Sequence, residues 1–165
     1  MLNRTKLRAA IAAVFAVIAV GGGVLATPGA TSKTSKSAGN QLAGTWTVTV
    51  SRPAPLPPVF SLQVYTARGS MVESGNDSKS RSPQYASWKR VGGREYAATG
   101  VFFRFDPQTE AFVGRMKSNR TINLARDGQS FTFRGRATST DANGNVVASF
   151  PVSGSGQRLQ VEREP

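Results

Sequence analysis

The sequence predicts an all-β domain: a single antiparallel up-and-down barrel of roughly eight strands. Three observations support this. Apolar residues from Gln41 onward recur with a period of two, not the 3.6 of a helix. Turn-forming residues separate the alternating segments at short intervals, and no segment after the leader has a helical apolar stripe. Short connections favour a closed meander over a sandwich, whose crossovers are longer.

Residues 1–30 have the pattern of a secretory signal peptide. A basic start (residues 1–8) precedes an apolar run (residues 9–20), and small residues follow. Cleavage is expected after Ala26, with Ala30 as second choice, which would make the product secreted or extracytoplasmic. An uncleaved membrane anchor is the alternative, because the uncharged stretch is nearly long enough to span a bilayer.

Residues 31–40, TSKTSKSAGN, are expected to form a flexible tether, since they contain no apolar side chain large enough to bury. The barrel domain is expected to occupy residues 41–165, a length that provides one core.

The alternation of apolar and polar residues places the strands. They are expected at 45–50, 60–65, 71–73, 84–91, 94–105, 112–124, 129–137, 146–152 and 157–162. Four prolines in residues 51–58 exclude ladder pairing there. The polar residues 74–83 are expected to be a mobile surface loop. Both faces of the strand at 94–105 carry aromatic residues.

The turn at Asp127 and Gly128 fixes a hairpin register. In this register Ile122 faces Phe133 and Arg120 faces Gly135. Arg120 therefore shares a face with large apolar residues. An arginine cannot lose its charge, so a buried one needs an anion.

The anion beside Arg120 could be Glu73, Glu95, or the carboxylate or phosphate of a ligand. The alternative is a β-bulge near Ser118 and Asn119 that turns Arg120 outward, or a solvated place at the barrel mouth.

The composition excludes several classes of site. The chain has no Cys and no His, which excludes disulfides, Ser-His-Asp catalysis and the usual zinc or copper centres. No cofactor or metal is expected.

The formal net charge is +12, of which three charges lie in the leader, leaving about +9. Because the basic residues are spread over several segments, nucleic acid is not expected as a partner.

Gly44 and Trp46 form a Gly-x-Trp at the start of the first strand, and Arg158 lies near the chain's end. In these features the chain resembles the lipocalin-like, or calycin, barrels and the allene-oxide-cyclase-like barrels. The resemblance implies that Trp46 lies across the closed end with Arg158 stacked on it. Lipocalins usually carry a C-terminal helix after the barrel, and no such helix is expected between the last predicted strand and Pro165.

The hairpin's other face is basic, carrying Arg115, Lys117, Arg134 and Arg136. This face is expected either to be solvated or to contact an anionic envelope surface.

The function expected from these features is a small-molecule-binding barrel for a hydrophobic or amphipathic, acidic ligand. Its ligand-binding residues are expected to be Arg120, Glu95, Phe103, Phe105, Phe131 and Phe133. The alternatives are a cyclase or isomerase that uses Glu73 or Glu95, or a ligand-free envelope interaction module. No spacing singles out a catalytic pair.

Overall fold

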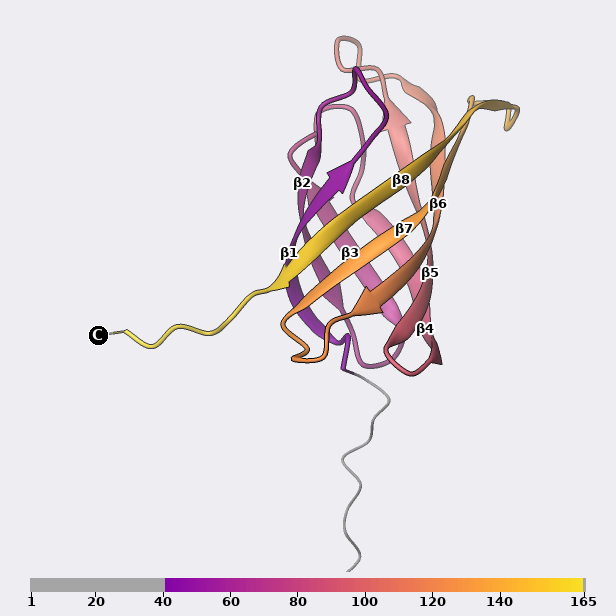
Figure 1. The fold of residues 1–165 in the computed structure, drawn as a ribbon. Coiled ribbons are helices and arrows are strands. Elements are labelled where there is room, and N and C mark those ends of the chain that lie inside the picture. Colours follow the sequence, from indigo (N-terminus) through magenta and orange to yellow (C-terminus); the bar gives the residue numbers. More distant parts are fainter. Residues whose placement is uncertain (1–40, 165) are drawn as a thin grey trace, which may run out of the picture. The chain divides into compact units, whose positions relative to one another are not determined.

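A computed structural model describes residues 41–164 of the chain. The expected signal peptide (1–30), its cleavage near Ala26 and the expected tether (31–40) lie outside the described residues. Eight antiparallel strands close in sequence order into one barrel, which confirms the predicted fold class (Figure 1). Among the described residues, no helix has the length and hydropathy needed to cross a membrane.

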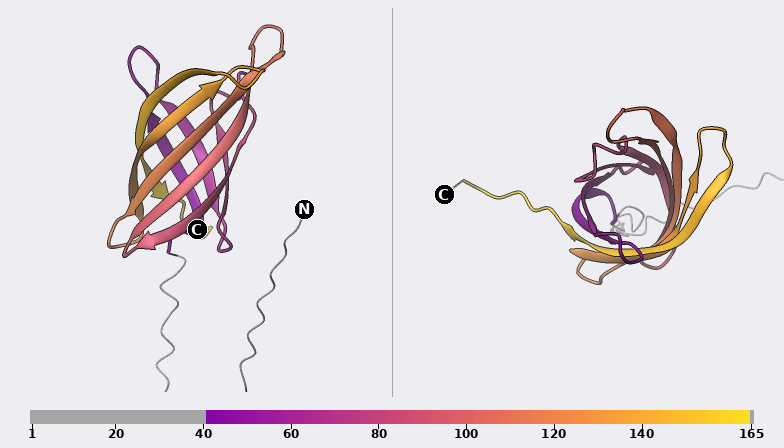
Figure 2. Two further views of the ribbon diagram at one scale, coloured as in Figure 1. Left: turned by 90° about the vertical axis from the view of Figure 1, so that its right-hand side faces the viewer. Right: turned by 90° about the horizontal axis from the view of Figure 1, so that it is seen from above.

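The strands differ from the prediction mainly at their ends. They are β1 Gly44–Ser51, β2 Val59–Tyr65, β3 Ser70–Gly75, β4 Gln84–Gly92, β5 Glu95–Phe105, β6 Phe112–Leu124, β7 Ser130–Thr140 and β8 Val146–Arg158. The β1–β2, β3–β4, β5–β6 and β7–β8 connections surround one end of the barrel, called here the open end. The β7–β8 hairpin leans outward from the barrel wall at this end (Figures 1 and 2).

The break that the sequence predicts between the last two strands is absent. The segments expected at 146–152 and 157–162 are a single strand, β8, which ends at Arg158. Gly154 and Gly156 disturb the apolar alternation in the sequence because they lie against aromatic rings. A side-chain atom at Gly154 would meet the ring of Phe133, and one at Gly156 would meet the ring of Phe131. These glycines make room for core aromatics rather than for a turn.

The opposite, closed end is filled by an aromatic core. The Trp46 and Phe131 ring centroids are 4.8 Å apart, and Trp88 contacts Tyr65 and Tyr96 at 6.0 and 5.6 Å, all in edge-on geometry. Such pairs add to the stabilisation from apolar burial. The buried residues that surround these rings are Leu42, Met71, Ile122, Leu124 and Phe133.

Trp46 and Arg158 meet where the first and last strands pair. The guanidinium of Arg158 lies 4.2 Å from the Trp46 ring centroid. It also donates hydrogen bonds to the carbonyls of Gly128, Ala43 and Gln41, at 2.8, 2.8 and 2.5 Å. One side chain thus ties β8 to the chain before β1 and to the β6–β7 turn.

Gly156→Ala tests how tightly the closed end is packed. The added methyl would overlap the Phe131 ring, so we expect it to lower the free energy of unfolding by about 1–3 kcal/mol. Gly92→Ala is the matched control, because nothing lies within 4 Å of its added carbon. Urea unfolding followed by tryptophan fluorescence measures both. Equal effects of the two substitutions would show that the ring has room to move.

Candidate functional site: a cavity with unpartnered arginine nitrogens

The open half of the barrel contains a cavity of about 90 Å³. The polar and charged residues around it are Arg52, Glu73, Asp77, Arg81, Ser118 and Arg120, and the apolar ones are Val50, Val59, Phe102, Met116, Ala137, Phe150 and Val152. Charged and apolar side chains therefore line the same cavity.

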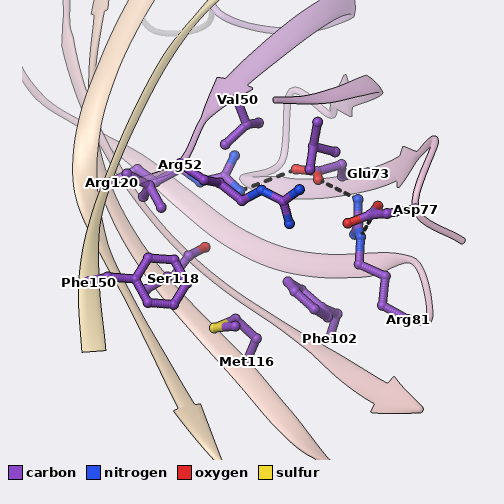
Figure 3. A pocket seen from close by; sticks show the side chains of 13 residues that line it. Val50, Arg52, Glu73, Asp77, Arg81, Phe102, Met116, Ser118, Arg120 and Phe150 are labelled. Carbon is purple, nitrogen blue, oxygen red and sulfur yellow. Dashed lines mark hydrogen bonds and ion pairs between the residues drawn. The ribbon is translucent and has the colours of Figure 1, made fainter. Parts of the chain in front are cut away.

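Glu73 is the central anion of this cavity. It lies on β3 with its side chain inside the barrel, and only 3% of the residue is exposed. Its carboxylate accepts hydrogen bonds from Arg81 at 3.0 Å, Arg120 at 3.2 Å and Gln63 at 2.8 Å. Figure 3 shows Glu73 between the two arginines. One carboxylate thus serves as counter-ion to two guanidinium groups.

Arg120 reaches the cavity from β6, in the register that the hairpin predicts. It pairs with Gly135 of β7, and no bulge interrupts this part of the ladder. Its Nη2 donates to Glu73 and, at 2.7 Å, to the Gln84 side-chain oxygen, and its guanidinium carbon lies 5.0 Å from the Phe133 ring centroid. Its Nε and Nη1 are buried with no hydrogen-bond partner.

Arg81 enters the same cavity from the β3–β4 connection. This segment belongs to the stretch 74–83 that was expected to be a mobile surface loop; most of it is an exposed or half-buried connection, but Arg81 is buried, contrary to that expectation. Arg81 is only 6% exposed and forms an isolated bridge with Arg104. Its Nε donates to Asp77 at 2.5 Å, its guanidinium lies 4.8 Å from the Phe102 ring, and its Nη1 is buried without a partner.

A polar layer connects the cavity to the aromatic core. Tyr65 donates its hydroxyl proton to Gln63 at 2.8 Å, and Gln63 donates in turn to Glu73. Gln84 donates to Ser118 at 2.7 Å while accepting from Arg120. Burial raises the pKa of Tyr65, so its hydroxyl stays protonated and acts as a donor. These bonds fix the positions of Glu73 and Arg120.

A wider mouth adjoins the cavity at the open end. Phe102, Met116 and Phe150 border both spaces. The mouth has a volume of about 420 Å³, and its rim includes Leu56 and Val147. An elongated ligand with its polar end at the arginines would therefore extend along an apolar path.

The expected ligand-binding residues do not all lie together. Arg120 lines the cavity and Phe105 lines the mouth. Phe131 and Phe133 are buried in the aromatic core, at 2% and 4% exposure.

The prediction that Phe103 and Glu95 face the interior of the barrel, as ligand-binding residues would, is wrong. Phe103 is 51% exposed and Glu95 is also exposed, so both lie outside the barrel. Pairing with β6 places Ala98 beside Arg120, which turns Phe102 inward instead. Because aromatics occupy both faces of β5, its alternation could not select between them.

Reasoning from the sequence missed Arg81, Asp77, Gln63 and Gln84 as members of the site. Gln63 and Gln84 are completely buried, but the alternation of β2 gave no signal for Gln63, because the apolar residues Phe60, Leu62 and Val64 lie on the opposite, exposed face of that strand. Arg81 carries no signal either, because the residues around it show no periodicity.

The described residues contain no group of three or more acidic side chains placed to hold a metal ion. Comparison with protein-family models, curated proteins and solved structures finds no match for this chain. The function is therefore inferred from the chemistry of the cavity.

Glu73→Gln tests the role of the shared counter-ion. It leaves Arg120 buried without a carboxylate, and we expect a loss of about 3–5 kcal/mol in the free energy of unfolding. The double variant Glu73→Gln/Arg120→Met no longer contains the unpaired buried charge. We expect it to recover more than half of the lost free energy of unfolding. The control is Glu95→Gln, on an exposed glutamate, with an expected change within about 0.5 kcal/mol. Chemical denaturation measures all three, and equal stability of Glu73→Gln and Glu95→Gln would contradict this role.

Proposed function

We propose that this protein binds a small amphipathic acid, with its carboxylate at Arg120 and Arg81 and its apolar part toward the open end. The observation that carries the proposal is the set of unpartnered nitrogens: Nε and Nη1 of Arg120 and Nη1 of Arg81. A buried N–H without an acceptor is costly, and a carboxylate from outside would supply the missing oxygens.

The charge of the cavity favours a monoanion. Arg81 and Arg120 are accompanied by Glu73 and Asp77, so these four groups balance one another. A ligand with two negative charges would be repelled by the Glu73 carboxylate, whereas one carboxylate can meet the free sides of both guanidinium groups. Arg52 at the cavity and Arg104 at the mouth add positive charge along the path.

The shape of the space favours a short apolar tail. A cavity of about 90 Å³ is smaller than the several hundred cubic ångströms that enclose a drug-sized ligand. A head group and a few carbons fill it, and the remaining carbons lie in the mouth against Phe102, Met116 and Phe150. Binding in the interior of a barrel is also the use that a lipocalin-like architecture implies.

Three probes separate the contributions of head and tail. Octanoate supplies both, acetate only the carboxylate, and 1-octanol only the tail. We expect octanoate to raise the melting temperature of the full chain and to bind at least tenfold more tightly than either of the others. Isothermal titration calorimetry gives the affinities. Equal binding of octanoate and 1-octanol, or no binding of octanoate at millimolar concentration, would overturn the proposal.

Ala137→Leu tests the location without removing a charge. Ala137 lines the cavity and is 5% exposed, so the larger side chain would occupy the space that the ligand needs. We expect at least a tenfold loss of octanoate affinity with the barrel retained by circular dichroism. Val146→Leu is the control, because Val146 is 67% exposed and lies outside the cavity. Octanoate affinity unchanged by Ala137→Leu would place the acid elsewhere.

A further inference from the structure

The outer surface of β4, β5 and β6 carries large apolar side chains that ligand binding inside the barrel does not use. They are Tyr85 (64% exposed), Val101 (36%), Phe103 (51%) and Phe112 (48%). Single exposed apolar residues are common on soluble proteins, whereas a contiguous group marks an interaction surface.

These residues are contiguous because of the strand register. Tyr85 of β4 pairs directly with Val101 of β5, so their side chains are neighbours on the outer face. Phe103 lies two positions along β5, and its ring is 5.9 Å from that of Phe112. The four residues therefore form one apolar patch on three strands, and it continues onto β3 and β2 through Val72 and Val64, which are 41% and 44% exposed.

A basic patch begins at the next strand pairing. Val101 pairs with Lys117 and Phe103 pairs with Arg115, so both β5 residues of the apolar patch have a cation beside them. Arg136 and Arg134 continue the basic patch on β7.

The cations of this patch have no acidic partners. Arg115, Lys117, Arg134 and Arg136 are exposed, and among residues 41–164 none of them forms an ion pair. Arg136 donates only a 3.3 Å hydrogen bond to Ser149. Their charge is therefore available to an external anion.

We propose that these two adjoining patches, together the cationic–aromatic face, dock on an anionic lipid bilayer. Basic side chains near such a surface are attracted to its headgroups, and aromatic and aliphatic side chains insert at the level of the headgroups. The structure joins both kinds of side chain through direct cross-strand pairs. A lipid interface, which offers negative charge beside an apolar layer, complements both patches at once.

Other occupants match only part of this face. A second copy would bring two basic patches together, and residues 41–165 have sixteen Lys and Arg against nine Asp and Glu, so charge opposes self-association. A soluble polyanion would neutralise Lys117 and Arg115 but would leave Phe103 and Tyr85 in water.

Docking of this face would also bring the barrel mouth near the lipid. Phe112 contacts Phe105, and Phe105 lines the mouth. An amphipathic acid dissolved in the bilayer would then have a short path to Arg120, a consequence that rests on the proposed function. Docking itself does not depend on ligand binding.

Vesicle co-sedimentation of the full chain tests the docking. The vesicles contain phosphatidylcholine alone or with 30% phosphatidylglycerol. We expect Arg115→Gln/Lys117→Gln to bind the anionic vesicles about 30-fold more weakly, the effect of two charges near such a surface. We expect Tyr85→Thr/Phe103→Thr to bind about tenfold more weakly. The control Arg68→Gln/Arg126→Gln removes two exposed charges from turns at the closed end and should change binding less than twofold.

Because residues 1–40 are identical in every variant, differences between variants report the barrel alone. A second measurement locates the contact. Brominated lipids should quench an indole introduced by Phe103→Trp, but not one introduced by Thr47→Trp on β1, across the barrel.

Three results would overturn the proposal. Equal loss of binding in the control variant would show non-specific attraction, and equal quenching at both positions would place the contact elsewhere. Unchanged binding of Tyr85→Thr/Phe103→Thr to the vesicles would indicate that the partner of this face is a soluble polyanion and not a bilayer. Octanoate affinity measured on the same variants separates this outcome from the proposed function, because substitutions on the outer face should leave it within about twofold.

Discussion

The open half of this barrel depends on one buried carboxylate. Two guanidinium groups inside a protein would each cost several kcal/mol without a counter-ion. Glu73 compensates both by accepting from Arg81 with one oxygen and from Arg120 with the other, and Asp77 adds a second ion pair to Arg81. Because Arg120 uses only Nη2 for these contacts, its Nε and Nη1 are buried without a hydrogen-bond partner. The arrangement that compensates the two charges therefore leaves N–H groups of both arginines without acceptors, which is the basis of the proposed acid binding.

The cavity lies where it does because the two halves of the interior differ in side-chain volume. At the closed end the inward positions carry Trp, Tyr and Phe, and glycines such as Gly156 are needed to fit them. At the open end the corresponding positions of β1, β2, β7 and β8 carry Val50, Val59, Ala137 and Val152. Small side chains on these four neighbouring strands leave part of the interior of an eight-stranded barrel unfilled. The cavity therefore lies at the open end.

The sequence determines strand-level features better than it determines the site. The turn at residues 127–128 has a definite geometry, so the pairing of Arg120 with Gly135 followed from it and is confirmed. Arg81 could not be foreseen, because its burial depends on contacts with Glu73 of β3 and Phe102 of β5, which only the folded barrel brings to one place. Phe103 was misplaced because local alternation says which residues share a face, but not which face points inward.

The alternation of β5 and β6 also couples the interior to the outer surface. Phe102 stacks on Arg81 inside while its neighbour Phe103 lies outside, and Met116 lines the cavity while Lys117 is exposed. Successive side chains of a strand point to opposite faces. A one-residue shift in the register of either strand would therefore turn its inward side chains outward and its outward side chains inward. The hairpin that orients Arg120 therefore also orients Lys117 and Arg115. A single register therefore specifies the arginine-lined cavity and the cationic–aromatic face together.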